Sequence, residues 1–344
     1  MKNIIIILLL VTGITTQAQQ AKRDSLIKAI DEHAANTYKA ANQFLNRRLS
    51  TAERIKAIAP YSMIYDAKQV AEFKRVILSN DEAPEIRATA LDKIDDHASS
   101  DAEIIKLATD WVGNTQAPMT LRRGGLNIIA ISTFSSMRVP DVLQKLLDDP
   151  DMDFRIYAYT QLVQHGNDMA QQRLIRGLEN PQSANLPAPV AIGILNMAAK
   201  KEYYPAVYKV LQTTKDEPTR LEAVRALGSY KEAREKLKSI STSSSEKSEF
   251  REAALGALYS GDKENIIGYA TPILKDKSAT PRLQAIAIQM SIDVRQAMSY
   301  RAKASKADDY DKLIKDIAEG NGALRSNELQ NTATKYMQIV RPKY

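Results

Sequence analysis

The side chains most able to do chemistry in this sequence are arginines that recur at a near-constant spacing. Consecutive members stand 31 to 35 residues apart when Pro189 is counted as a degenerate member. Arginine forks bind phosphate well, so such a series could form a ladder that grips a polyanion. We expect a structural role instead, in which each guanidinium bonds the carbonyls and carboxylates of neighbouring turns, because a shared binding ladder should not skip a position. The arginines are Arg87, Arg122, Arg155, Arg220, Arg251 and Arg282.

Residues that usually build metal or catalytic centres are few and scattered. His33, His97 and His165 are far apart in the sequence, and none has the spacing of a zinc-binding helix. The chain has no Cys, which excludes disulfides, a thiolate nucleophile, a cysteine zinc site and an N-terminal lipoprotein cysteine. It also lacks a nucleophile elbow, a Walker loop and a dinucleotide fingerprint. We therefore expect no catalytic residue, no metal and no cofactor.

Two short motifs permit a functional and a structural interpretation. The acidic run from Asp148 to Asp153 resembles the start of a calcium loop, but it lacks the turn glycine and the closing glutamate. Capping of the following helix explains it better. Gly124 and Gly125 lie inside a helical pattern, so close packing of helices explains them better than phosphate binding.

Tyrosines concentrated in the middle of the chain are the candidates for recognition. Rigid, amphipathic tyrosine rings are enriched in protein interfaces. The same residues also fill cores, and Tyr159 falls on an apolar helical face, so both interpretations stay open. The candidates are Tyr157, Tyr203, Tyr204, Tyr208 and Tyr230.

The elements that position these residues are predicted by an apolar pattern that accompanies each arginine. In the copy at Arg220, apolar side chains follow at Leu221, Ala223, Val224 and Leu227, which is one face of a helix. A second apolar stretch precedes each arginine and predicts the first helix of a pair. A serine-rich segment at 239–248 is expected to be a loop. The expected first helices are 68–79, 102–112, 141–148, 168–178, 203–213, 231–239 and 264–275.

The arginine-centred segments resemble the second helix of HEAT repeats of the phycobilisome-lyase type. In that family a short turn with Asp or Pro leads into Val-Arg-Ala-Ala-Ala and then Ala-Leu-Gly, and residues 216–228 match this pattern. Seven copies cover 68–295, with a weaker one at 53–58 that Pro60 should end. The resemblance implies an all-α fold, an α-solenoid of the armadillo/HEAT type built from stacked antiparallel helix pairs. It also implies that the arginines pair with acidic groups and helix caps in the adjacent turn.

The two ends of the chain differ from the repeats. Lys2, the apolar run 4–11 and the small residues around Ala18 predict a signal peptide over 1–18. The alternative, a membrane anchor, is disfavoured because the apolar run is too short to span a bilayer. We expect 19–67 to hold a helical cap, with one amphipathic helix at 24–48, and the tentative first repeat. Residues 296–344 should hold a basic linker and a divergent last pair at 310–318 and 327–340.

Charge and architecture together favour a binding protein. The net charge of +7 arises from lysines and arginines interspersed with acidic residues, which is typical of a solvated surface. We expect a non-enzymatic scaffold that binds a protein in the bacterial periplasm or outside the cell, with no transmembrane span in the mature chain. The Ala18-Gln19-Gln20 segment after the apolar run resembles signal peptides of Bacteroidota, which implies the same location. Two alternatives stay open: a nucleic-acid-binding HEAT protein similar to alkylpurine glycosylases, and a lyase-like enzyme that shares the repeat scaffold.

Overall fold

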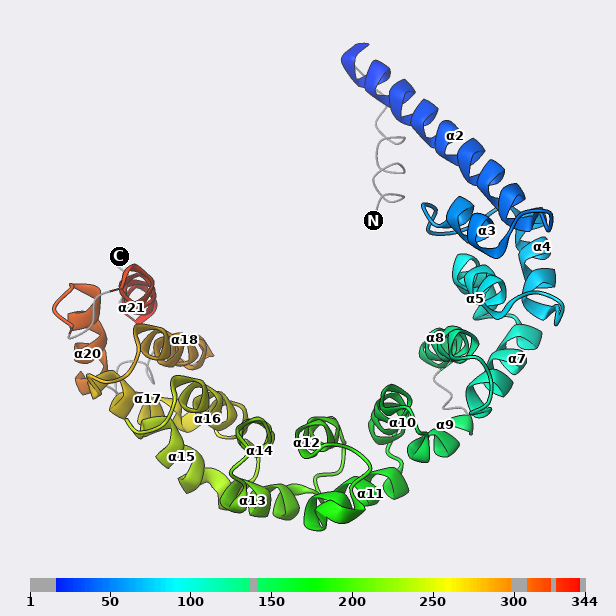
Figure 1. Cartoon of the computed structure of the whole chain (residues 1–344). Coiled ribbons are helices and arrows are strands. Elements are labelled where there is room, and N and C mark those ends of the chain that lie inside the picture. The colour runs from blue at the N-terminus through cyan, green and yellow to red at the C-terminus, as the bar shows by residue number, and fades with distance from the viewer. Residues whose placement is uncertain (1–16, 137–140, 298–307, 323–325, 341–344) are drawn as a thin grey trace. The chain divides into compact units, whose positions relative to one another are not determined.

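The computed structural model describes residues 17–136, 141–297, 308–322 and 326–340. Within these ranges every regular element is a helix and no strand occurs, so the expected all-α class is confirmed (Figure 1). The chain forms two compact units, Met1–Lys145 and Leu146–Tyr344. The expected repeat range 68–295 therefore extends over both units.

In the first unit, two rows of helices pack against each other. Helices α2, α4, α7 and α9 contact one another in that order, and so do α3, α5 and α8. Within each pair the members also contact each other, as α4 does α5 and α7 does α8. The bounds are α2 Gln17–Leu45, α3 Thr51–Ile58, α4 Ala67–Leu78, α5 Pro84–Lys93, α6 Asp95–Ala98, α7 Ala102–Gly113, α8 Met119–Ser136 and α9 Val142–Lys145.

The second unit continues the alternation with longer rows. Helices α10, α12, α14, α16, α18 and α21 contact in that order, while α11 contacts α13, and α15 contacts α17, which contacts α20. Four single-turn helices lie in the connections. The bounds are η1 Leu146–Asp148, α10 Met152–Gln164, α11 Asp168–Glu179, η2 Pro181–Ser183, α12 Ala188–Asn196, α13 Tyr204–Thr213, α14 Glu217–Ala226, η3 Lys231–Ala233, α15 Arg234–Thr242, α16 Ser248–Gly261, η4 Lys263–Asn265, α17 Ile266–Lys275, α18 Pro281–Ala297, α20 Asp308–Ala318 and α21 Asn327–Val340.

Side-chain caps define where many of these helices begin. Asp101, Asp151 and Asp216 are N-cap residues of α7, α10 and α14, and each carboxylate accepts hydrogen bonds from backbone N–H groups of the first turn. Such caps satisfy donors that have no partner inside the helix. Asp151 belongs to the acidic run 148–153, so the capping interpretation of that run is confirmed. Ser50 forms a reciprocal capping box with Glu53 at the start of α3.

The expected first helices agree with the observed ones to within three residues, with one notable shift. Helix α15 ends at Thr242, so the serine-rich loop is shorter than the expected 239–248. Ile240 and Ser241 are buried there, and the Ser241 hydroxyl donates to the carbonyl of Lys238. Burial of this last turn outweighs the low helix propensity of serine and threonine, and the expectation of a loop from 239 was wrong.

The N-terminal helix α2 covers the first pair with only its last turns. Ala40, Ala41 and Phe44 are buried, and the Phe44 ring stacks on Phe73 of α4 with centroids 4.9 Å apart. Earlier in the helix, Leu26, Ile27, Ile30 and Tyr38 are exposed. The expected covering role of 24–48 therefore holds only from residue 40 onward, because the earlier turns have no helix to pack against within the described part of the unit.

Several expectations fall on residues that the structure does not describe. Residues 1–16 of the expected signal peptide lie outside the described residues, and so does most of the expected basic linker, 298–307. Within the described ranges, no helix is both long and apolar enough to cross a membrane.

Candidate binding surface

The repeated arginine joins the two helices of a pair. It is the fourth residue of the second helix, and its guanidinium donates to a carbonyl ten residues earlier, on the penultimate residue of the first helix. Carbonyls at a helix C-terminus have no partner inside the helix and carry partial negative charge, so a cation there satisfies both needs. The bonds are Arg54 Nε to Phe44 O (2.6 Å), Arg87 Nε to Ile77 O (2.9 Å), Arg122 Nη2 to Val112 O (3.2 Å) and Arg251 Nε to Ser241 O (3.1 Å).

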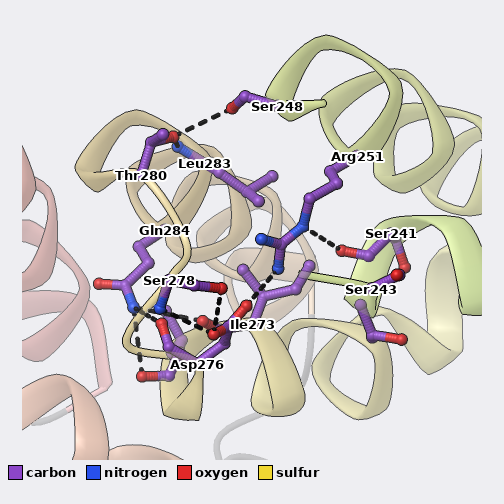
Figure 2. A network of polar contacts seen from close by, with 12 residues as sticks. Ser241, Ser243, Ser248, Arg251, Ile273, Asp276, Ser278, Thr280, Leu283 and Gln284 are labelled. Atoms are coloured by element: carbon purple, nitrogen blue, oxygen red, sulfur yellow. Dashed lines mark hydrogen bonds and ion pairs between the residues drawn. The ribbon is translucent and has the colours of Figure 1, made fainter. Parts of the chain in front are cut away.

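At Arg54, Arg220 and Arg251, a carboxylate from the turn of the next pair also bonds the fourth-position arginine. Arg54 bonds Glu82 at 2.7 Å and Arg220 bonds Glu246 at 2.9 Å. Figure 2 shows the third case, in which Arg251 reaches Ser241 on one side and Asp276, at 2.6 Å, on the other. Arg54 and Arg251 therefore link their pair internally and to its successor, in agreement with the structural interpretation.

Arg87 is stabilised in a different way. The turn that follows in the next pair, 114–118, contains no acidic residue. The guanidinium carbon lies 4.9 Å from the Trp111 ring centroid, so the aromatic face supplies the negative potential. Burial lowers the pKa of Arg87, and its Nη2 is buried without a hydrogen-bond partner among the described residues.

The structure corrects the expected position of the arginine in two copies. The Arg282 side chain is 74% exposed and bonds only Glu252. The fourth residue of α18 is Gln284, which is buried and donates to Leu274 O at 3.3 Å (Figure 2). In α12 the fourth residue is Ala191 instead of Pro189. Arg282 and Pro189 are each the second residue of their helix, so a series spaced by 31 to 35 residues placed both copies two residues before the fourth position.

Arg155 keeps the fourth position of α10 but not the usual partners. Its guanidinium donates to three carbonyls, those of Asp149, Pro150 and Asn185. No carboxylate lies within ion-pair distance of it among the described residues. The following turn, 180–187, contains no acidic residue, so the Asn185 carbonyl takes the place that Glu246 or Asp276 fills elsewhere.

Four of the five candidate tyrosines lie together at one end of the α13–α14 pair. Tyr203 is fully buried and donates its hydroxyl to Asn196, so the core interpretation applies to it. Tyr204, Tyr208 and Tyr230 are partly exposed, and we call them the tyrosine cluster. Ring centroids are 5.2 Å apart for Tyr204 and Tyr230 and 5.7 Å apart for Tyr208 and Tyr230. These aromatic pairs hold the rings in fixed orientations.

Tyr157 lies apart from the tyrosine cluster on α10. Its hydroxyl is buried without a hydrogen-bond partner among the described residues, and burial raises the pKa of Tyr157 to about 12. The core interpretation therefore applies to this residue, as it does to Tyr159, which is fully buried.

A pocket of about 690 Å³ opens at the other end of the same pair, where the arginine series is interrupted. We call it the α12 pocket, since it lies around the N-terminus of that helix and the connection before it. Its presence was not predicted from the sequence, although the missing arginine at this level was a usable signal. It is lined by Met152, Arg155, Gly177, Leu178, Pro181, Ala184, Asn185, Leu186, Pro187, Ala188, Val210, Thr213, Thr214, Asp216 and Thr219.

The remaining candidates for chemistry stay scattered. His33 is exposed on α2, His97 is exposed on α6, and His165 is exposed directly after α10. Across the part of the chain that the structure describes, no three metal-ligating side chains come together. Gly125 packs closely on α7, since a Cβ there would lie 2.8 Å from the carbonyl oxygen of Ala108, which confirms the packing interpretation.

Comparison with known proteins adds no further constraint. No protein-family model, no curated protein and no solved structure matches the chain.

Proposed function

We propose that this chain is a non-enzymatic scaffold of the α-solenoid, HEAT-type class that binds a protein partner in the bacterial cell envelope. Support for the architecture comes from fourth-position arginines such as Arg54 and Arg251, which bond both helices of their own pair and the turn of the next pair. Such nearest-neighbour interactions are the way that solenoids are stabilised. Support for a location in the cell envelope comes from the sequence of residues 1–18, which resembles a signal peptide.

The tyrosine cluster is the observation that carries the binding function. Partly exposed tyrosines offer a large contact area at a small loss of side-chain entropy, because their rings are already held by one another. A cluster on consecutive elements, from α13 to the start of η3, suits a protein surface better than a small ligand. We therefore place the partner contact on Tyr204, Tyr208 and Tyr230.

The internal use of the arginines disfavours the nucleic-acid alternative. Arg54, Arg87, Arg122 and Arg251 are buried and donate to carbonyls inside the protein. A guanidinium used in this way does not release counterions from a phosphate backbone, which is the main source of affinity for nucleic acid.

Affinity capture tests the proposal. Residues 19–344, immobilised by one terminus, are incubated with native cell-envelope extract, and co-eluting proteins are identified by mass spectrometry. We expect a specific protein to be enriched on the wild-type chain and lost on the chain with Tyr204→Ala, Tyr208→Ala and Tyr230→Ala. Tyr65→Ala is the matched control, since this tyrosine is 70% exposed and lies in the other unit. Equal recovery on all chains, or no enriched protein, would contradict the proposal.

A further inference from the structure

The α12 pocket lies where the described chain omits both halves of its repeated ion pair. In three other pairs, an arginine at the fourth position forms an ion pair with a carboxylate in the next turn: Arg54 with Glu82, Arg220 with Glu246 and Arg251 with Asp276. At the level of α12, the turn 180–187 supplies no carboxylate and the fourth position is Ala191. The absence of both the arginine side chain and the carboxylate from the pair α11–α12 leaves space, and the pocket lies there.

The helix pairs before and after α12 retain the charged residues with which the missing groups would have formed ion pairs. Arg155, on the preceding pair, has only carbonyl partners. Asp216, in the turn of the following pair, bonds only Thr219 through its carboxylate and has no cation within ion-pair distance among the described residues. These two side chains are the charged members of the pocket lining. The pocket is therefore lined by one cationic and one anionic side chain, and neither forms an ion pair among the described residues.

Asp216 keeps its charge at neutral pH. Hydrogen bonds from the side chain and the backbone N–H of Thr219 lower the pKa of its carboxyl group. The residue is exposed, so a ligand can reach it without a change of the fold.

The rest of the lining is mainly apolar. Its apolar members include Leu178, Leu186 and Val210, with Pro181 and Pro187. Apolar walls with a few polar groups are typical of ligand sites, and a volume of about 690 Å³ accommodates several side chains.

We propose that the α12 pocket binds a polypeptide segment of the partner that carries an acidic and a basic side chain separated by apolar residues. The acidic group pairs with Arg155 and the basic group with Asp216, so the ligand supplies the two groups that the α12 level omits. The apolar side chains between them fill the pocket. This inference rests on the proposed scaffold function and names the chemistry of the segment that the scaffold recognises.

Two conservative substitutions remove the charges while they keep the local structure. Asp216→Asn preserves the N-cap of α14, because asparagine caps as well as aspartate. Arg155→Gln follows the example of Gln284, which fills the same position of α18 and bonds carbonyls from there. Thermal melting of both variants is measured first, and we expect both to melt within a few degrees of the wild type.

The probes are synthetic capped peptides, acetyl-Glu-(Leu)n-Arg-amide with n from one to four, titrated into residues 19–344 by calorimetry. We expect one spacing to bind best and each substitution to weaken it about five-fold, the range of a partly exposed ion pair. Replacing the peptide arginine with glutamine should weaken binding to the wild type but not further weaken binding to Asp216→Asn. Replacing the peptide glutamate with glutamine should show the same relation to Arg155→Gln.

Three results would overturn the inference. They are the absence of binding at millimolar concentration for every spacing, equal affinity for the wild type and both variants, and strictly additive losses in the two double-mutant cycles. A peptide with only one of the two charges that binds as tightly as the doubly charged one would also overturn it. Capture of a partner that depends on the tyrosine cluster would then leave the scaffold function standing, so the two failures are distinguishable.

Discussion

At the scale of single residues, the fourth residue of the second helix in a pair determines how that helix is bonded to the first helix. Arginine there neutralises the C-terminal carbonyls of the preceding helix and reaches a carboxylate in the next turn. Gln284 performs the first task without the second, and Arg87 replaces the carboxylate with the Trp111 ring. The position is therefore defined by the carbonyl that it must satisfy, and arginine is the residue that also connects to the next pair.

This assignment predicts different effects for two arginines that look equivalent in the sequence. Arg251→Ala removes a buried guanidinium and leaves the Ser241 carbonyl and the Asp276 carboxylate without it, so we expect a loss of about 2–4 kcal/mol in the free energy of unfolding. Arg282→Ala removes an exposed side chain, so we expect a change below about 0.5 kcal/mol. Urea denaturation followed by circular dichroism measures both. Similar losses would show that Gln284 does not occupy the arginine position.

The ion pair between Arg220 and Glu246 predicts a dependence of stability on pH. The side-chain hydrogen bond from Arg220 is the main reason that the pKa of Glu246 falls below its ordinary value of 4.5. A carboxyl group whose pKa is lowered by folding stabilises the fold above its unfolded pKa, and this contribution disappears as the pH falls through the folded pKa.

We therefore expect Glu246→Gln to lower stability at pH 7 and to reduce the loss of stability between about pH 5 and pH 3. Denaturation midpoints of the wild type and the variant, measured at steps across this range, should converge toward the acid end. Curves that stay parallel would mean that this carboxylate has the same pKa in the folded and unfolded chains.

At the scale of elements, close approach between second helices depends on glycine at one contact. Helix α16 packs on α14, and Gly261 lies so near Gly228 that a Cβ at position 261 would be 1.6 Å from the Gly228 carbonyl oxygen. A Cβ at position 228 would lie 2.4 Å from the carbonyl oxygen of Ala257. Both contacts are with backbone atoms, which cannot rotate away as a side chain can.

Gly228→Ala should therefore destabilise the protein by about 1–3 kcal/mol, since the two helices must separate. Gly256→Ala is the matched control inside α16, where a Cβ meets no atom within 4 Å. There we expect a gain of about 0.5–1 kcal/mol, because alanine favours the helix more than glycine does. Thermal melts of the two variants test the contact, and a Gly228→Ala protein as stable as the wild type would contradict it.

Helix positions were largely predictable from the sequence, whereas the alignment of residues within them was less so. Apolar spacing and capping residues such as Asp101 and Asp216 placed most helix ends to within three residues. The segment 239–248 was misread because its serines and threonines have loop-like composition, although tertiary packing buries Ile240 and Ser241. Arg282 was misassigned because the Pro-Arg pair occurs two residues earlier in its helix than the corresponding arginine does elsewhere.

The candidate surface was predictable by residue type but not by exposure. Tyrosine enrichment drew attention to 203–230, and three of those rings are partly exposed. Tyr203 and the hydroxyl of Tyr157 are buried by packing between helices, and the sequence alone does not specify those contacts. The α12 pocket arises from the absence of two groups at one level, and such an absence becomes visible only when every helix start is known.

At the scale of the whole molecule, the described chain repeats the fourth-position interaction with variations, and at α12 both the fourth-position polar side chain and the carboxylate of the turn before the helix are missing. The interruption at α12 creates a pocket at one end of the α13–α14 pair, and the tyrosine cluster occupies the other end. The proposed partner would contact both ends of this helix pair. Recognition would therefore involve residues 203–230 together with the residues of 152–188 that line the pocket.

Hydrogen–deuterium exchange of residues 19–344, with and without the captured partner, tests this placement most directly. We expect the bound partner to slow amide exchange in 198–230 and in the connection 180–188, with little change in 17–136. Slowed exchange confined to 17–136, or unchanged exchange throughout, would contradict it.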